Sequence, residues 1–173
     1  MGLLSNDDIL LRAPEPEDLE YLYRWENDPD LWKYAAITSP YSRYALKEYI
    51  SAGTHDIYQT NQLRFIIEDK LRGIPAGTVD LYDFDPHHQR AGVGILVDKD
   101  FRRRHIASQS IRLVIEYAFS FLHLHQLYVH IPVLNQPSIL LFRSVGFVFS
   151  GTLKEWIHTS EGYEDVCVMQ QLK

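Results

Sequence analysis

Residues 93–108 read VGILVDKDFRRRHIAS, and this stretch decides the fold. Its first five residues are typical of a strand, a short basic loop follows, and a long helix begins at about His105. The first backbone N–H groups of a helix have no intrahelical partner, and together with the helix dipole they attract anions. The stretch therefore predicts a pyrophosphate site formed by Arg102, Arg103, Arg104, His105, Ile106, Ala107 and Ser108.

The rest of the chain predicts a mixture of strands and helices. Alternating or continuous apolar runs bounded by turn residues predict strands at 9–12, 64–68, 77–82, 91–97, 127–133, 147–156 and 166–172. Apolar residues at helical spacing, together with start and stop signals, predict helices at 17–25, 43–51, 105–122 and 138–145. The expected fold class is α+β (mixed α/β).

Two segments resemble motifs of the GNAT acetyltransferase superfamily. The basic loop resembles motif A, which reads Gln/Arg-x-x-Gly-x-Gly/Ala; Arg102 and Ala107 fit its two ends, and His105 replaces the middle glycine. Residues 135–147, NQPSILLFRSVGF, resemble motif B, in which an asparagine begins a short helix, a tyrosine follows seven residues later and Gly-Phe opens a strand. Phe142 stands at the tyrosine position.

The resemblance extends over nearly the whole chain. Residues 11–18 and 25–28, together with 151–155 and 162–165, resemble the spermidine/diamine and ribosomal-protein N-terminal acetyltransferase branches. The family implies one acetyltransferase domain over residues 1–173, with a central mixed sheet of about seven strands, about four flanking helices and two parallel strands that splay apart. It also implies that acetyl-CoA is the cosubstrate and that its pantetheine arm lies between the splayed strands.

The resemblance also implies roles for individual residues. Besides the basic loop, the residues expected to bind CoA are Leu96, Val97, Asn135, Ser138 and Phe142. In the family reaction a neutral amine attacks the thioester directly, and a backbone N–H at the end of the motif A strand, here that of Leu96 or Val97, stabilises the oxyanion. Phe142 cannot donate a proton to the departing thiolate, so water, Ser138 or a nearby tyrosine takes that role.

His130 is the favoured general base. It lies on the strand 127–133, with its neighbours facing the opposite way, and an imidazole pKa near 6.5 suits proton transfer. A core histidine bonded to backbone is the alternative. Glu26 and Asp80 are the second choices for the base.

The acceptor site is expected in the aromatic-rich region after the first helix, where aromatic faces would hold a cationic amine. The residues expected to contact the acceptor are Trp25, Glu26, Trp32, Tyr34 and Asp80. Ordinary packing of these aromatic side chains is the alternative.

Composition narrows the function classes. The formal net charge is −6, which argues against nucleic-acid binding, and no apolar stretch is long enough to span a bilayer. The single cysteine, Cys167, allows no internal disulfide, which suits a cytoplasmic protein. The adjacent pair His87-His88 does not predict a metal site, because neighbouring residues rarely converge on one ion.

Three functions remain open. The first is acetylation of a primary amine of a small molecule or polyamine, although Thr38-Ser39 stand where spermidine-type relatives carry paired acids. The second is acetylation of a protein N-terminus, of the ribosomal-protein type. The third is a non-catalytic acyl-CoA-binding protein. The sequence does not name the amine acceptor and leaves a homodimer open.

Overall fold

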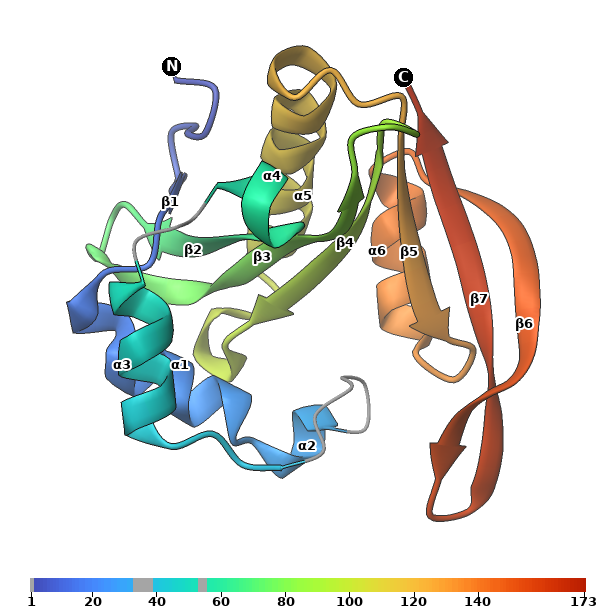
Figure 1. The fold of residues 1–173 in the computed structure, drawn as a ribbon, viewed down its shortest axis with the longest axis horizontal. Coiled ribbons are helices and arrows are strands. Elements are labelled where there is room, and N and C mark those ends of the chain that lie inside the picture. The colour runs from blue at the N-terminus through green and yellow to red at the C-terminus, as the bar shows by residue number, and fades with distance from the viewer. Residues whose placement is uncertain (1, 33–38, 53–55) are drawn as a thin grey trace.

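A computed structural model describes residues 2–32, 39–52 and 56–173. In this part of the chain seven strands form one sheet in the order β1-β2-β3-β4-β5-β7-β6 (Figure 1). The strands are β1 (Ile9–Arg12), β2 (Leu63–Asp69), β3 (Ile74–Asp85), β4 (Arg90–Val97), β5 (Gln126–Pro132), β6 (Val148–Thr159) and β7 (Gly162–Leu172). The seven-stranded mixed sheet expected from the sequence is confirmed.

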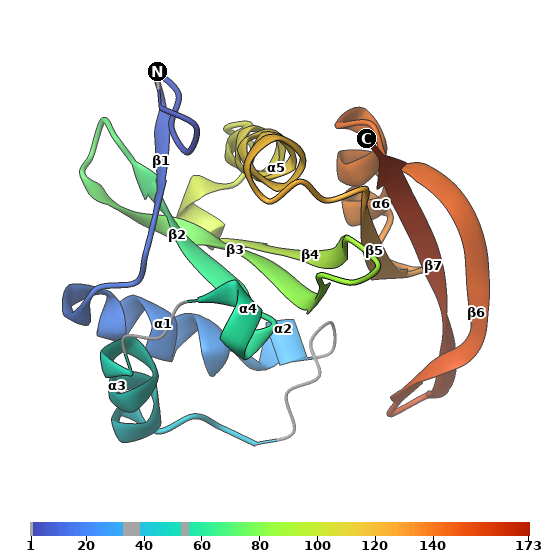
Figure 2. The same ribbon diagram turned by 45° about the horizontal axis from the view of Figure 1, so that its top comes forward.

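Helices cover both faces of this sheet. In Figure 2, α1 and α3 lie on one face and α5 on the other, with α6 beside β5 and β7. The helices are α1 (Leu19–Glu26), α2 (Pro29–Trp32), α3 (Arg43–Ser51), α4 (Ile57–Thr60), α5 (Ile106–Glu116) and α6 (Gln136–Ser144). The four longer helices correspond to the four expected ones, whereas α2 and α4 are single turns too short to show a helical period.

The two faces bury separate apolar clusters. Leu22 and Trp25 of α1 pack with Leu46 and Ile50 of α3 on the face that we call the α1 face. The larger cluster joins the sheet to α5 and α6 on the opposite, α5 face, and includes Ile111 and Val114. Successive side chains of a strand therefore point alternately to the α1 face and the α5 face. A site on one face can be reached only by every second residue of a strand.

The helix expected at 105–122 changes character before its end. Regular α-helix stops at Glu116, and Tyr117–Phe121 form a π-helical turn. The backbone N–H of Leu122 donates to the carbonyl of Tyr117, five residues earlier, at 3.1 Å. His123 then adopts a left-handed conformation, with a φ of 55°, and the chain turns towards β5.

The central feature of the sheet is the divergence of two parallel strands. β4 pairs with β5 only where Arg90, Ala91 and Gly92 face 126–128. β3 stays paired with β4 as far as Val97, and β7 stays paired with β5 as far as Pro132. The remainder of β4 and β5 therefore has one unpaired edge each, and these two edges face each other. The splayed parallel strands expected from the sequence are present.

Candidate functional site

The basic loop between β4 and α5 has an unusual backbone. His105 and Arg103 both have left-handed conformations, with φ angles of 59° and 60°. Side chains rarely adopt this conformation, because their Cβ approaches the following carbonyl, whereas glycine adopts it freely. The structure thus explains why the motif has glycine at the position of His105: the turn into α5 needs a left-handed residue there.

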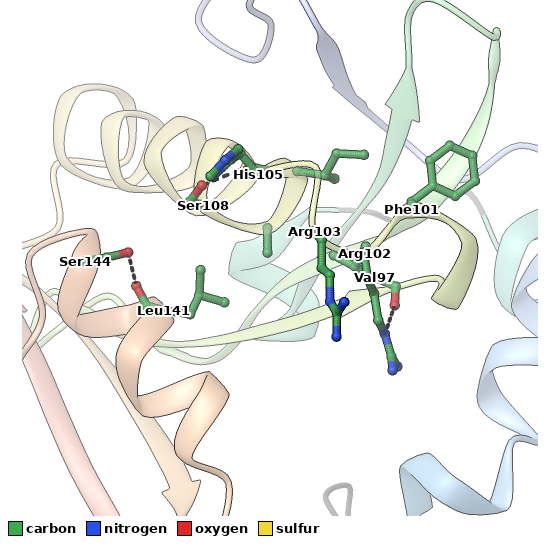
Figure 3. A pocket seen from close by; sticks show the side chains of 10 residues that line it. Val97, Phe101, Arg102, Arg103, His105, Ser108, Leu141 and Ser144 are labelled. Atoms are coloured by element: carbon green, nitrogen blue, oxygen red, sulfur yellow. Dashed lines mark hydrogen bonds between the residues drawn. The ribbon is translucent and has the colours of Figure 1, made fainter.

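A hollow of about 270 Å³ lies against this loop. Six of the seven loop residues expected to bind the pyrophosphate line it: Arg102, Arg103, His105, Ile106, Ala107 and Ser108. Figure 3 shows Leu141 and Ser144 of α6 on the side opposite Arg102 and Arg103. The seventh residue, Arg104, turns elsewhere, with its guanidinium 5.7 Å from the ring centre of Phe101.

Two polar side chains of the loop bind the protein itself. The Ser108 hydroxyl donates to the His105 carbonyl at 2.9 Å, inside the first turn of α5, so in this geometry its proton is not directed at a phosphate. The Arg102 Nε donates to the Val97 carbonyl at 3.5 Å, a long contact visible in Figure 3. The backbone N–H groups at the start of α5 and the charge of Arg103 remain as the main anion-binding groups.

The backbone of β4 distinguishes between the two candidate oxyanion donors. The N–H of Asp98 donates to the Ala76 carbonyl at 2.9 Å, and polar groups alternate between the two edges of a strand. Leu96 therefore faces β3, and its carbonyl oxygen lies 2.1 Å from the point that a Cβ on Gly77 would occupy. The structure contradicts the expectation that Leu96 supplies the donor, because its N–H is directed at β3. The N–H of Val97, one residue further along the strand, points the other way, towards the unpaired edge.

Glu26 and Asp80 come together although they are far apart in the sequence. Arg64 of β2 bridges them: its Nε and Nη2 donate to Asp80 at 2.9 and 2.8 Å, and its Nη1 pairs with Glu26. Burial lowers the pKa of Arg64, but the two carboxylates outweigh this effect and raise it. Both acids therefore accept hydrogen bonds from one guanidinium, which does not favour either as the general base. The cluster has a net charge of −1.

The aromatic residues expected at the acceptor site have different surroundings. Trp25 is 4% exposed and its indole N–H donates to Asp98 at 2.7 Å, so most of its ring is packed in the core, although it also lines the hollow described below. Trp32 is half-buried and donates to the Glu26 carbonyl at 2.8 Å. Tyr34 lies outside the described residues. A second hollow of about 440 Å³ separates α1 and α2 from the end of β4.

His130 lies on the exposed α1 face of β5, not in the core. Its side chain is exposed and its ring centre lies 5.4 Å from that of Tyr128. The Val133 N–H donates to the Asp165 carbonyl, and the Lys173 N–H donates to the His125 carbonyl. The backbone N–H and C=O groups of odd-numbered residues in β5 therefore point towards β7, and those of His130 point towards the unpaired edge. The alternative of a core histidine is excluded, and the role of general base stays a prediction.

Motif B has the expected cap and an unexpected core residue. The Asn135 side chain accepts the Ser138 backbone N–H at 3.3 Å and caps α6. The Ser138 side chain is half-buried, and its role as an acid stays a prediction. Phe142 is 1% exposed and packs edge-on against Phe147, with ring centres 5.0 Å apart. Such burial contradicts direct contact between Phe142 and CoA.

Sequence reasoning missed three residues of the α1 face: Arg64, Tyr82 and Gly92. The Tyr82 ring lies so close to Gly92 that a Cβ there would be 2.3 Å from the ring. The available signal was the pair Gly92 and Gly94 within one strand, since alternating glycines leave one face of a strand without side chains and mark a close approach. Asp80 and Tyr82 lie opposite these two glycines on β3.

No group of three or more His, Cys, Asp or Glu side chains in 2–32, 39–52 and 56–173 could hold a metal ion. In the same part of the chain no helix is long and apolar enough to cross a membrane.

The sequence pattern of a known family matches most of this chain. Residues 8–148, from β1 to the start of β6, match the Acetyltransferase (GNAT) domain. The chain belongs to this family. It is an N-acetyltransferase that uses acetyl-CoA.

Individual relatives are similar along almost their whole length. Spermidine N(1)-acetyltransferase of Vibrio cholerae is 28% identical over 162 residues, covering 93% of this chain and 91% of the relative. The enzyme of the same name in Escherichia coli K12 is 26% identical over 170 residues, covering 96% and 88%. The putative ribosomal N-acetyltransferase YdaF of Bacillus subtilis is 26% identical over 172 residues, covering 97% and 93%.

Solved structures share the fold. The crystal structure of spermidine N-acetyltransferase from Vibrio cholerae in complex with CoA and spermine superposes with a TM-score of 0.85 at 28% identity, covering 96% of each chain.

Proposed function

We propose that this chain transfers the acetyl group of acetyl-CoA to a primary amine of a polyamine. The observation that carries the proposal is a charged cluster on the α1 face, where Glu26 and Asp80 both pair with Arg64. A net negative cluster on the face from which an acceptor would approach favours a polycation over a neutral or acidic amine. The relatives named for spermidine acetylation, and the one bound to CoA and spermine, support the same acceptor class.

The reaction follows from the arrangement of the unpaired edges. The pyrophosphate of acetyl-CoA binds at the start of α5, and the pantetheine arm follows the edge of β4 past Val97. An amine on the α1 face loses a proton to His130 or to water, and its nitrogen attacks the thioester carbon. The C–N bond forms, the C–S bond breaks, and CoA leaves as a thiolate. Because a thiol has a pKa of about 8.5, water can then protonate the thiolate without a side-chain acid.

The test is a comparison of acceptors under one set of conditions. Release of free CoA is measured with spermidine, spermine, a diamine and a short peptide with a free α-amino group. Spermidine or spermine should give the highest kcat/KM. A clear preference for the peptide would instead support N-terminal acetylation of proteins, the activity for which YdaF is named. Binding of CoA without turnover of any of these amines would refute the proposal.

Two variants of α1 test the role of charge. Glu26→Gln keeps the shape of the side chain beside Arg64 but removes its charge, and should raise KM for spermidine more than KM for acetyl-CoA. Glu20→Gln is the matched control, because Glu20 lies on the same helix but pairs with Arg43 in an exposed ion pair. Equal effects of the two substitutions would show that the acidic cluster does not select the acceptor.

A further inference from the structure

Arg112 of α5 lies beside the hollow at the start of that helix. Ser108 lines the hollow, and Arg112 follows it four residues later, so the two lie on one face of α5, about 6 Å apart along the helix axis. Side chains of a helix lean towards its N-terminus, which brings Arg112 towards Ser108. The Arg112 Nη2 donates to the carbonyl of Ser144, the last residue of α6, at 3.3 Å, and Ser144 also lines the hollow. Arg112 therefore borders the hollow where α5 meets α6.

The two α6 residues that line this hollow bring no charge to it. Leu141 is apolar, and the Ser144 hydroxyl donates to the Leu141 carbonyl at 2.7 Å, as Figure 3 shows. The cations Arg102 and Arg103 lie on the opposite side. A positive charge for an anion on the α6 side of the hollow is therefore supplied by Arg112.

Most donors of the Arg112 guanidinium are unused. The side chain is exposed, and the long bond to the Ser144 carbonyl is its one hydrogen bond or ion pair among residues 2–32, 39–52 and 56–173. That carbonyl is one of the last four of α6, which have no intrahelical partner and attract a cation. A guanidinium has five N–H donors in a planar fork that matches phosphate oxygens. The end of α6 thus holds Arg112 in place and leaves its remaining donors for a ligand.

CoA carries a second anionic group that fits this position. One ribose ring of the cosubstrate has the pyrophosphate on its 5′ oxygen and a phosphate monoester on its 3′ oxygen. The ring separates these groups by about one helical turn, which is also the distance from Ser108 to Arg112 along α5. With the pyrophosphate at the start of α5 and the pantetheine arm leaving past Val97, the ribose lies on the side of Ser144 and Arg112.

We propose that Arg112 binds the 3′-phosphate of CoA and so distinguishes CoA from 3′-dephospho-CoA. The guanidinium donates charge-assisted hydrogen bonds to the phosphate oxygens through the N–H groups that the Ser144 carbonyl does not use. The 3′-phosphate is remote from the thioester, so this contact contributes to the binding of the cosubstrate and not to the rate of acetyl transfer. The inference rests on the pyrophosphate lying at the start of α5 and not on which amine accepts the acetyl group.

Calorimetry with CoA and with 3′-dephospho-CoA, in the absence of any amine, measures this contact. Wild type should bind CoA about tenfold more tightly than 3′-dephospho-CoA, as expected for hydrogen bonds between charged groups. Arg112→Gln should lose this preference and keep its affinity for 3′-dephospho-CoA. Arg112→Glu should reverse the preference, because its carboxylate repels the 3′-phosphate. Equal affinities of wild type for the two ligands, or a preference that Arg112→Gln retains, would overturn the inference.

Arg143→Gln is the matched control. Arg143 is an exposed arginine next to Ser144, and it is not among the residues that line the hollow. Burial raises the pKa of Cys167 on β7 and the charge of Arg143 lowers it in part, so Arg143 lies on the β7 side of α6. This variant should keep the wild-type preference for CoA. An equal loss of preference in Arg112→Gln and Arg143→Gln would show that a general loss of positive charge is the cause, which contradicts a direct contact with Arg112.

A spectroscopic test observes the phosphate itself. In ³¹P NMR the 3′-phosphate of CoA has a resonance separate from those of the pyrophosphate, and a phosphate monoester loses its second proton with a pKa of about 6. A neighbouring guanidinium favours the dianion, so the pKa of the 3′-phosphate should be lower in the wild-type complex than in free CoA. Arg112→Gln, but not Arg143→Gln, should move it back towards the free value. If this pKa is the same in the wild-type and Arg112→Gln complexes, the inference is wrong even when polyamines are acetylated; if it shifts as expected but no polyamine reacts, only the acceptor proposal fails.

Discussion

The indole N–H of Trp25 donates to the buried carboxylate of Asp98 at 2.7 Å. This bond joins the end of α1 to the residue that follows β4, and Arg24 pairs with the same carboxylate. Asp98 also accepts the Asp100 N–H at 3.0 Å and so shapes the turn that leads into the phosphate loop. A single side chain thus connects the α1 face with the cosubstrate site.

Asp98→Ala should destabilise the protein and weaken CoA binding. The substitution leaves the buried Trp25 N–H without an acceptor, which costs about 1–3 kcal/mol of folding free energy. Urea unfolding measures the loss, and calorimetry measures CoA affinity. Glu20→Ala is the control, because it breaks only a solvent-exposed ion pair with Arg43, which contributes little to stability. Equal losses in the two variants would show that Asp98 does not connect these elements.

Asp98 should also contribute to sensitivity to acid. Burial raises the pKa of Asp98, but the Asp100 N–H, the Trp25 indole and Arg24 outweigh it, so the pKa lies below its usual value. A carboxyl with a lowered folded-state pKa stabilises the fold above its unfolded pKa of about 3.9, and this stability is lost as the pH falls further. Unfolding midpoints should therefore drop below pH 4 more steeply in wild type than in Asp98→Asn. Parallel curves for the two proteins would contradict this account.

His105→Gly should not destabilise the protein, and should stabilise it by up to about 1 kcal/mol. A left-handed conformation costs a residue with a side chain about 1–2 kcal/mol, and glycine avoids this strain at some expense in unfolded-state entropy. Thermal unfolding measures the change. Ala107→Gly is the control: it lies in the first turn of α5 with ordinary helical geometry, and glycine should cost about 1 kcal/mol there.

Arg103→Gly separates strain from charge in the same loop. Arg103 has nearly the same φ as His105, so its replacement relieves similar strain. It also removes a cation from the hollow at the pyrophosphate loop, so CoA binding should weaken at low salt and the loss should shrink at high salt. A loss of affinity that is independent of salt would mean that Arg103 acts through geometry and not through charge.

The sequence predicted the backbone around the basic loop much better than the surroundings of the residues expected to contact the acceptor. The phosphate loop is local: a strand, a basic turn and a helix start follow one another within residues 93–108, so their order in the chain defines their positions in space. The residues of the α1 face, in contrast, come from parts of the chain that are far apart in the sequence. Arg64 meets Glu26 and Asp80 through three different elements, and no spacing in the sequence indicates such a meeting.

The errors have the same physical origin. The pairing register of β3 and β4 decides whether the N–H of Leu96 or that of Val97 points to the unpaired edge. A shift of one residue in this register would exchange the two N–H groups. For Trp25 the alternative of ordinary packing is confirmed, and the sequence does not show that Asp98 lies beneath its indole as an acceptor. Phe142 matched a motif position, but its surroundings are set by Phe147 and the core.

Phe142→Tyr should reduce stability without a gain in rate. Phe142 is 1% exposed and packs against Phe147, so a new hydroxyl would be buried without a partner at a cost of about 1–3 kcal/mol. The measurements are kcat with an accepted amine and the midpoint of thermal unfolding. A correctly placed acid is worth about 10²–10⁴ in rate, so a faster variant would show that the hydroxyl reaches the leaving thiolate after all.

Gly92→Ala should destabilise the protein by about 1–3 kcal/mol, as expected when a methyl group is forced into a packed site. A methyl group at Gly92 would lie 2.3 Å from Cε2 of Tyr82 and 2.4 Å from its Cζ, so the ring must move away from β5. Gly92 has no left-handed φ, so the substitution introduces no backbone strain of its own. Urea unfolding measures the loss, and wild-type stability in Gly92→Ala would show that the Tyr82 ring moves aside at no cost.

Gly151→Ala and a double variant complete this test. A Cβ on Gly151 would meet no atom within 4 Å, so this control should keep its stability. If Gly92→Ala acts by displacing the Tyr82 ring, it should cost much less stability in a Tyr82→Ala background, which removes the ring, because the effects of contacting residues are not additive. Equal losses in the two backgrounds would show that contact with the Tyr82 ring is not the cause.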